Sequence, residues 1–114
     1  MALQRNKAMA YLGLAARAGK VESGEFCTER AVKSGQARLV LLAGDASKNT
    51  QKRFRDMCTY YHTDWRVYGD KESLGHAIGR GERASLAVTD EGLARAIKEQ
   101  LTDRNQDGGS EHGK

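Results

Sequence analysis

The sequence contains no proline, only two cysteines and few aromatic residues, which account for 6% of its 114 positions. Without proline a collagen-like chain is excluded. Cys27 and Cys58 do not form a CxxC pair. The three histidines show no ligand spacing with them, so neither a redox motif nor a zinc site is predicted. In a reducing compartment we expect both cysteines to be small buried side chains, with no metal site and no disulfide.

Long hydrophobic runs are absent as well. No apolar stretch approaches the roughly 20 residues that a membrane-spanning helix needs, and the first residues contain no apolar block of secretory length. We therefore expect no membrane contact and a cytoplasmic location. The 39% hydrophobic and 30% charged residues are typical of one small globular domain. Nineteen lysines and arginines against fifteen aspartates and glutamates give a net charge of +4, which favours a polyanionic partner.

The spacing of hydrophobic residues predicts alternating helices and strands. The unbroken apolar run at residues 38–44 is typical of a strand covered on both faces, so we place it at the centre of the sheet. The alternation predicts an α/β fold: a three-layer α/β/α sandwich with a mixed sheet of about four strands and helices on both faces. We assign residues 1–102 to this single domain and expect residues 103–114 to form a disordered polar tail. The predicted helices cover residues 3–18, 24–35, 50–61, 71–78 and 90–102, and the predicted strands cover residues 20–22, 38–44, 65–69 and 84–89.

The same hydrophobic spacing predicts which side chains cap the helices and which lie in the core. Ser23 and Asp70 stand where they can cap the second and fourth helices. Tyr61 and Trp65 fit core positions; the alternative is that they, like Tyr60, are exposed and stack on nucleic-acid bases. The apolar faces of the first, second and last helices are expected to include Tyr11, Leu14, Ala15 and Ala18, then Cys27, Ala31 and Val32, then Leu93, Ile97 and Leu101.

The residues that an enzyme would need do not form a catalytic arrangement. The sequence lacks a GxxxxGKS or GxxxxGKT phosphate loop, and its one GxG, at residues 79–81, follows a predicted helix rather than a strand. Both cysteines fall on apolar helix faces, where packing explains them. The acidic pairs stand at helix starts, where capping explains them. We predict that the protein is not an enzyme, has no catalytic residues, and uses no cofactor and no small-molecule substrate.

Gly24 opens the second helix at a point where a side chain would obstruct a ligand. A glycine there lets an RNA backbone approach the free N–H groups of the first helical turn. Arg30 and Lys33 follow on the solvent face of that helix, and Arg17 and Lys20 precede it in the sequence. These residues predict an anion-binding surface around Gly24. The alternative is a solvated charged face, because acidic residues interleave with the cations.

A second glycine-containing loop, at residues 78–84, carries Arg80 and Arg83. Guanidinium groups offer fork-shaped donors and a flat face that stacks on an unpaired base, as recognition of unpaired RNA requires. The loop therefore predicts nucleic-acid binding, with an ordinary exposed loop as the alternative. The sequence does not place it relative to Gly24.

The order of several segments resembles the ribosomal protein L7Ae superfamily, whose members bind kink-turn RNA. The similarity covers about residues 5 to 100 and is greatest to a branch of small bacterial YlxQ-type proteins. The matching segments are YLGLAARAGK at residues 11–20, Ser23-Gly24, AVKSGQARLVLLA at residues 31–43, Asp45-Ala46-Ser47, Asn49-Thr50, LGHAIG at residues 74–79 and AVTDEG at residues 87–92.

The resemblance implies that both loops bind kink-turn or related bent RNA. In the family, polar side chains after the glycine contact sheared G·A pairs and a lysine follows them; these places fall here on Phe26, Cys27 and Arg30. A phenyl ring forms no hydrogen bond with a base edge, so Phe26 is expected to stack while shape supplies selectivity. The expected RNA-binding residues are Arg17, Lys20, Gly24, Glu25, Phe26, Cys27, Arg30, Lys33, Arg80 and Arg83.

The resemblance further implies a ribosome- or translation-associated protein whose partner is structured RNA, such as ribosomal RNA or a kink-turn-like motif. We expect a monomer or a weak dimer. The alternative is a protein-interaction module on the same fold that has lost kink-turn readout. In that case an exposed Phe26 would be an apolar anchor in a partner's pocket.

Overall fold

The computed structural model describes the backbone of residues 2–104 and the side chains of residues 7–101. Helices and strands alternate along this part of the chain, as the hydrophobic spacing predicts. The elements are α1 (Ala2–Arg17), β1 (Val21–Ser23), α2 (Glu25–Lys33), β2 (Leu39–Leu42), α3 (Lys48–Tyr61), β3 (Trp65–Val67), α4 (Lys71–Ala77), β4 (Ser85–Val88) and α5 (Glu91–Arg104).

The strands of the described residues form one sheet in the order β1-β4-β2-β3. β2 and β3 are parallel, whereas β4 runs antiparallel to both of its neighbours, β1 and β2. The sheet is therefore mixed, as predicted. All four residues of β2 are buried inside it, which confirms that the apolar run at residues 38–44 marks the sheet centre.

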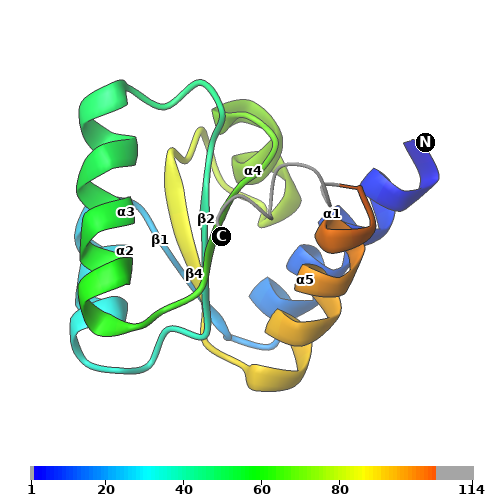
Figure 1. Ribbon diagram of the computed structural model, residues 1–114. Coiled ribbons are helices and arrows are strands. Elements are labelled where there is room, and N and C mark those ends of the chain that lie inside the picture. The colour runs from blue at the N-terminus through cyan, green and yellow to red at the C-terminus, as the bar shows by residue number, and fades with distance from the viewer. Residues whose placement is uncertain (1, 105–114) are drawn as a thin grey trace.

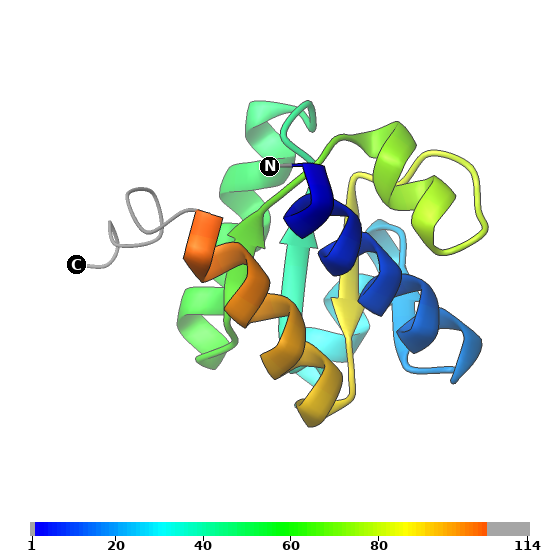
Figure 2. The same cartoon turned by 90° about the vertical axis from the view of Figure 1, so that its right-hand side faces the viewer.

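The inner strands bury side chains on both faces of the sheet. Along β2, Leu39 and Leu41 point to one face and Val40 and Leu42 to the other, because successive side chains of a strand alternate. Helices α1, α4 and α5 supply side chains to the first hydrophobic layer, and α2 and α3 supply them to the second (Figure 1). Figure 2 shows α1 and α5 side by side across the sheet. The predicted three-layer α/β/α sandwich is confirmed.

The buried face of α1 agrees only in part with the predicted one: Ala15 is buried and Tyr11 packs half-buried against the first hydrophobic layer, as predicted. Leu14 is 47% exposed and Ala18 is exposed, while among the described side chains of the helix, from residue 7 onward, Ala8, Leu12 and Ala15 are fully buried. Most positions from residue 8 to residue 18 are apolar, so helical spacing fits more than one face. Packing against α5 and the sheet selects the face that contains Leu12.

The sequence also predicts that Tyr61, Cys27 and Trp65 lie in the core, and the structure confirms this only for Trp65. Tyr61 is 40% exposed because it ends α3 and contacts the ring of Tyr60, with the centroids 4.9 Å apart, at the surface. Cys27 is only half-buried, because the neighbouring Thr28 faces β4 in its place. Trp65 packs against the second hydrophobic layer, as predicted.

The apolar faces predicted for the rest of α2 and for α5 are confirmed. Ala31 and Val32 are buried on α2. Ile97 and Leu101 are buried on α5, and Leu93 packs half-buried against the same layer. On α5 these positions are four residues apart, with the charged residues Arg95, Lys98 and Glu99 between them, so the spacing identifies one apolar face.

Of the two predicted helix caps, Asp70 is confirmed and Ser23 is wrong. Ser23 does not cap α2: it is the last residue of β1, and Gly24 occupies the cap position without a side-chain hydrogen bond. Strand pairing with β4 takes Ser23 into the sheet. Asp70 caps α4 as predicted, because its carboxylate accepts the Ser73 N–H at 2.7 Å and Ser73 Oγ accepts the Asp70 N–H at 3.1 Å.

The last helix is longer than predicted. α5 continues to Arg104, two residues into the segment expected to be a tail. The remaining tail, residues 105–114, lies outside the described residues. None of the helices in the described part of the chain is long and apolar enough to cross a membrane.

Candidate nucleic-acid interface

Three helices begin at the same end of the sheet. Strands β1, β2 and β3 run in one direction, so α2, α3 and α4, which follow them, all start at this end. β4 runs in the opposite direction, so the loop that precedes it also lies there. We call this end the rim and define it as residues 23–30, 43–48, 69–71 and 78–84. The start of α3, helix α4 and the loop before β4 lie at the top of Figure 1.

Hydrogen bonds join the glycine loop to the arginine loop within the rim. The Gly24 N–H donates to the Ser85 carbonyl at 3.0 Å. Arg83 Nε donates to Ser23 Oγ, also at 3.0 Å. Both contacts follow from the pairing of β1 with β4, which aligns Ser23 with Leu86. The structure thus brings together two loops that the sequence does not place relative to each other.

Gly24 is required at its position by backbone conformation. Its φ of 92° lies in the region that L-residues with side chains rarely adopt, and a Cβ there would meet no atom within 4 Å. No side chain caps α2, so the N–H groups of its first turn lack the partner that a capping residue would supply. The start of α2 is therefore open to an anionic ligand.

Phe26 and Arg30 lie next to this open turn. Phe26 is 70% exposed, and the guanidinium carbon of Arg30 lies 5.3 Å from the centroid of its ring. This is a cation–π contact, which holds the two groups together without a carboxylate. Among the described residues Arg30 has no ion-pair partner, so its charge is available to a ligand. Cys27 lies beside them, half-buried.

The arginine loop is held in place by α4. The Arg80 N–H donates to the Gly75 carbonyl at 2.8 Å, and the Arg83 N–H donates to the Lys71 carbonyl at 3.0 Å. The loop packs so closely on the helix that a Cβ at Gly75 would lie 1.9 Å from the Gly81 carbonyl oxygen. Arg80 is exposed, whereas Arg83 is half-buried by its contact with β1. The position of both arginines therefore depends on Gly75.

Three of the cations predicted to surround Gly24 lie elsewhere. Lys20 precedes β1, and its carbonyl accepts the Thr89 N–H at the other end of the strand. Four residues of extended chain place Lys20 about 13 Å from Gly24 along β1, and Arg17 lies beyond it at the end of α1. Lys33 ends α2, opposite its open turn. These cations are close to Gly24 in the sequence but not in space, because β1 or α2 separates them from it.

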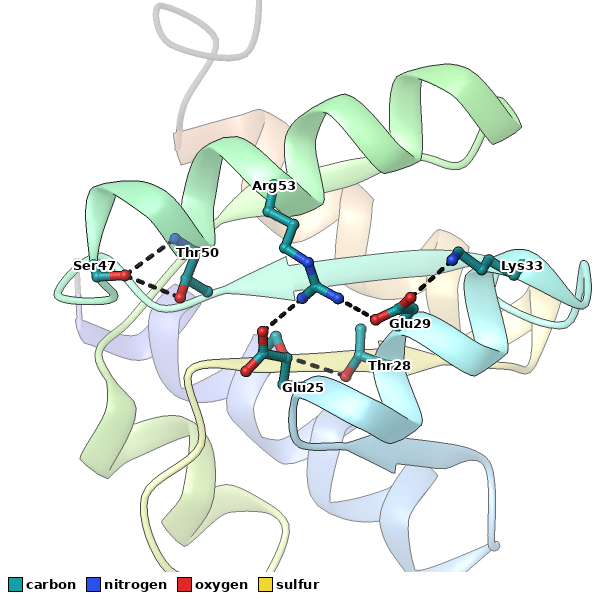
Figure 3. A network of polar contacts seen from close by, with 8 residues as sticks. Glu25, Thr28, Glu29, Lys33, Ser47, Thr50 and Arg53 are labelled. Atoms are coloured by element: carbon teal, nitrogen blue, oxygen red, sulfur yellow. Dashed lines mark hydrogen bonds and ion pairs between the residues drawn. The ribbon is translucent and has the colours of Figure 1, made fainter.

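Arg53 of α3 bridges two glutamates of α2. Its Nη1 lies 2.6 Å from Glu25 Oε2, and its Nη2 pairs with Glu29 Oε1 (Figure 3). Glu29 also pairs with Lys33 at 2.8 Å. The Lys33 hydrogen bond, with a contribution from Arg53, lowers the pKa of Glu29, and the same hydrogen bond raises the pKa of Lys33. Glu25 is thus turned toward α3, as Figure 3 shows, rather than toward a ligand at the rim.

Sequence reasoning missed several residues that shape the rim. Lys71 starts α4 there; its N–H donates to Asp45 Oδ1 at 2.8 Å, and its carbonyl holds Arg83. Thr28 and Ser85 form a buried hydroxyl pair, 3.4 Å apart, between α2 and β4. The sequence could have placed Lys71 at the rim, because Lys71, like Gly24, follows a predicted strand. No signal in the sequence pairs Thr28 with Ser85, which depends on the sheet order.

The described residues hold no cluster of three or more cysteine, histidine or acidic side chains that could bind a metal ion. Cys58 is fully buried in the second hydrophobic layer. Burial, with a smaller effect of Asp64, raises the pKa of its thiol to about 12. A thiol with so high a pKa is a poor nucleophile at neutral pH.

Comparison with known proteins places the chain among proteins of similar sequence and fold. A family model described as the ribosomal protein L7Ae/L30e/S12e/Gadd45 family matches residues 6–98. The RNA-binding protein YlxQ of Bacillus subtilis (strain 168) is 43% identical over 86 residues, covering 75% of this chain and 86% of that protein. The RNA-binding protein YlxQ of Enterococcus faecium is 36% identical over 95 residues, covering 83% of this chain and 91% of that protein.

Solved structures show the same fold. A protein of unknown function from Bacillus halodurans is 39% identical, with a TM-score of 0.81 over 83% of this chain and 96% of that chain. The 15.5kD RNA binding protein of Giardia lamblia is 18% identical, with a TM-score of 0.72 over 83% and 82% of the two chains. The family model spans most of the folded residues, and the expected similarity to YlxQ-type proteins is confirmed. The chain therefore belongs to the ribosomal protein L7Ae/L30e/S12e/Gadd45 family.

Proposed function

We propose that the protein binds structured, bent RNA of the kink-turn type through the rim. The observation that carries this proposal is the direct contact between the glycine loop and the arginine loop, made by Gly24 with Ser85 and by Arg83 with Ser23. An open helix start and a guanidinium-bearing loop then face one ligand. The two relatives named as RNA-binding proteins support the same class of ligand.

In this proposal backbone contacts supply the affinity and shape supplies the selectivity. The first-turn N–H groups of α2 donate to one phosphate, and Arg30, Arg80 and Arg83 bind others. Phe26 offers an exposed ring on which an unpaired base can stack. A phenyl ring and a thiol at positions 26 and 27 make few hydrogen bonds to base edges. A sharply bent RNA suits such a surface because its backbone can contact both loops at once.

The biological setting that we propose is the ribosome or another translation complex in the cytoplasm, with ribosomal RNA or a kink-turn-like motif as partner. The ribosomal protein family supports this setting. The role that we propose is binding rather than catalysis, and the names of the two RNA-binding relatives support it.

The salt dependence of RNA binding tests this function. The probe is a fluorescein-labelled hairpin RNA with a bulge next to tandem G·A pairs, titrated with protein at several salt concentrations; a fully paired hairpin of equal length is the comparison. Changing Arg30→Gln or Arg83→Gln should weaken binding and lower the log–log salt slope by about 0.7 to 0.9 for each phosphate that the variant no longer neutralises. Lys20→Gln removes the same charge at the other end of β1, about 13 Å from Gly24, and is the matched control. Equal binding by all four proteins, or equal affinity for bent and straight RNA, would contradict the proposal.

A second candidate function is docking of another protein, and the 70% exposure of Phe26 favours it. An exposed aromatic side chain beside an open loop has the properties of an anchor residue in an interface. Filter binding of total cellular RNA separates the two functions. RNA that is retained by the parent protein but not by Arg30→Glu supports RNA binding. No retention by the parent, together with a protein partner that only Phe26→Ala fails to bind, supports docking.

A further inference from the structure

The start of α2 carries two carboxylates beside the proposed phosphate site. Glu25 is the first residue of the helix, and Glu29 lies one turn later. Side chains four residues apart share one helix face, so both acids flank the open turn. Without a positive partner, the carboxylates of Glu25 and Glu29 would repel a phosphate bound at the start of α2. The proposed RNA interface therefore requires these charges to be neutralised.

Arg53 pairs with both acids, and Lys33 forms a second ion pair with Glu29. The two terminal nitrogens of Arg53 bind Glu25 and Glu29 separately, as Figure 3 shows, so one guanidinium serves both acids. Arg53 also comes from α3, which means that the contact ties the start of α2 to a neighbouring helix. The side chain is 40% exposed, and both terminal nitrogens are engaged with protein.

The contact also sets which face of α2 points outward. Phe26 and Arg30 each follow one of the two glutamates by a single position, so the two pairs lie on adjacent faces of the helix, about 100° apart. Holding Glu25 and Glu29 against α3 therefore directs Phe26 and Arg30 to solvent. Their exposure and mutual contact agree with this arrangement.

We propose that Arg53 is a positioning residue of the RNA interface, which neutralises Glu25 and Glu29 and thereby makes the start of α2 acceptable to phosphate. This inference rests on the proposed RNA-binding function. It assigns Arg53 an indirect role: the guanidinium acts through the two carboxylates and not by touching RNA.

The test compares RNA affinity among variants of the full chain, with the bulged hairpin RNA as probe. Arg53→Gln removes the partner of Glu25 and one of the two partners of Glu29, and is expected to weaken binding about tenfold. The triple change Arg53→Gln with Glu25→Gln and Glu29→Gln removes the carboxylates as well, and is expected to restore binding to within about threefold of the parent. Arg55→Gln is the matched control, since it removes the same charge from an exposed position of the same helix.

Restored affinity in the triple variant is the result that a purely structural role would not produce. If Arg53 only held α2 in place, the triple variant would bind as weakly as Arg53→Gln. If Arg53 bound phosphate directly, Arg53→Gln would lower the salt slope by about 0.7 to 0.9 and the triple variant would not recover. Either result overturns the inference, as does equal binding by Arg53→Gln and Arg55→Gln. Failure of the parent protein to bind the probe would instead refute the proposed function itself.

Discussion

Replacement of Gly75 by alanine should displace the arginine loop from the rim. Gly75 lies within α4, and a Cβ there would lie 1.9 Å from the carbonyl oxygen and 2.6 Å from the carbonyl carbon of Gly81. An ordinary contact begins near 3.4 Å, so the Gly81 carbonyl would have to move by at least about 1.5 Å. Both atoms belong to the backbone, so no side-chain rotation relieves the clash. The segment that moves carries Arg80 and Arg83.

The energetic effect combines two opposing terms. Overpacking of this kind costs about 1–3 kcal/mol, whereas alanine in place of glycine inside a helix contributes up to about 1 kcal/mol in the opposite direction. We expect a net loss near 1 kcal/mol, which lowers the melting temperature by about 4–8 °C in a domain of this size. RNA affinity should fall about tenfold, which corresponds to about 1.4 kcal/mol, because Arg83 leaves Ser23 when the loop shifts.

Gly92→Ala is the matched control for this prediction. Gly92 also lies in a helix, and a Cβ there would meet its nearest atom, Asp90 Oδ2, at an ordinary 3.5 Å. Circular dichroism melting and fluorescence anisotropy with the bulged hairpin RNA measure stability and binding. NMR amide shifts at Arg80 and Arg83 report movement of the loop. A Gly75→Ala protein with shifted loop amides and parental RNA affinity would show that the arginine loop is not part of the interface.

Three further predictions concern single side chains. Ser23→Ala removes the acceptor that holds Arg83 Nε and should weaken RNA binding about fivefold at nearly unchanged melting temperature; unchanged affinity would show that this contact does not orient Arg83. Asp70→Ala should lower the melting temperature because it removes the cap of α4. The hydrogen bond from the Ser73 N–H holds the pKa of Asp70 below its ordinary 3.8. The cap therefore stabilises the fold above pH 3.8, and this stabilisation is lost as the pH falls through the pKa of Asp70 in the folded protein. The melting-temperature difference from the parent should therefore shrink in acid, and a constant difference down to about pH 2 would contradict this reasoning. Cys58, whose pKa is raised to about 12, should resist iodoacetamide at about pH 8 until the protein is denatured, as measured by mass spectrometry; rapid labelling of the native protein would disagree with its burial.

The fold could be predicted from the sequence as far as local patterns determine it. The run Leu39–Leu42 is apolar on both faces, so its central place in a sheet follows directly. In α1 apolar residues surround most of the helix, so the choice between Leu12 and Leu14 as the buried residue depends on α5. The strand order β1-β4-β2-β3 depends on contacts between distant segments, which hydrophobic spacing does not encode.

The candidate site is predictable in its loops but not in its cations. Gly24 and Arg83 can be identified because glycine and arginine have distinct chemical uses in loops. Sequence proximity misplaces Lys20 and Lys33, because their distance from Gly24 is set by an intervening strand and helix. Arg53 gives no signal in the sequence because its partners lie on another helix, and only the packing of α2 beside α3 brings them together.

The common starting point of α2, α3 and α4 makes the molecule electrically polar along the sheet. Each helix carries a dipole whose positive end is its first turn, and these three positive ends share one end of the protein. The peptide groups thus add an asymmetry that the formal charge of +4 does not describe. The first-turn N–H groups of the three helices therefore attract an anionic group that reaches the rim, where acidic and basic side chains are both present. Added salt weakens this attraction because it shortens the range of the field.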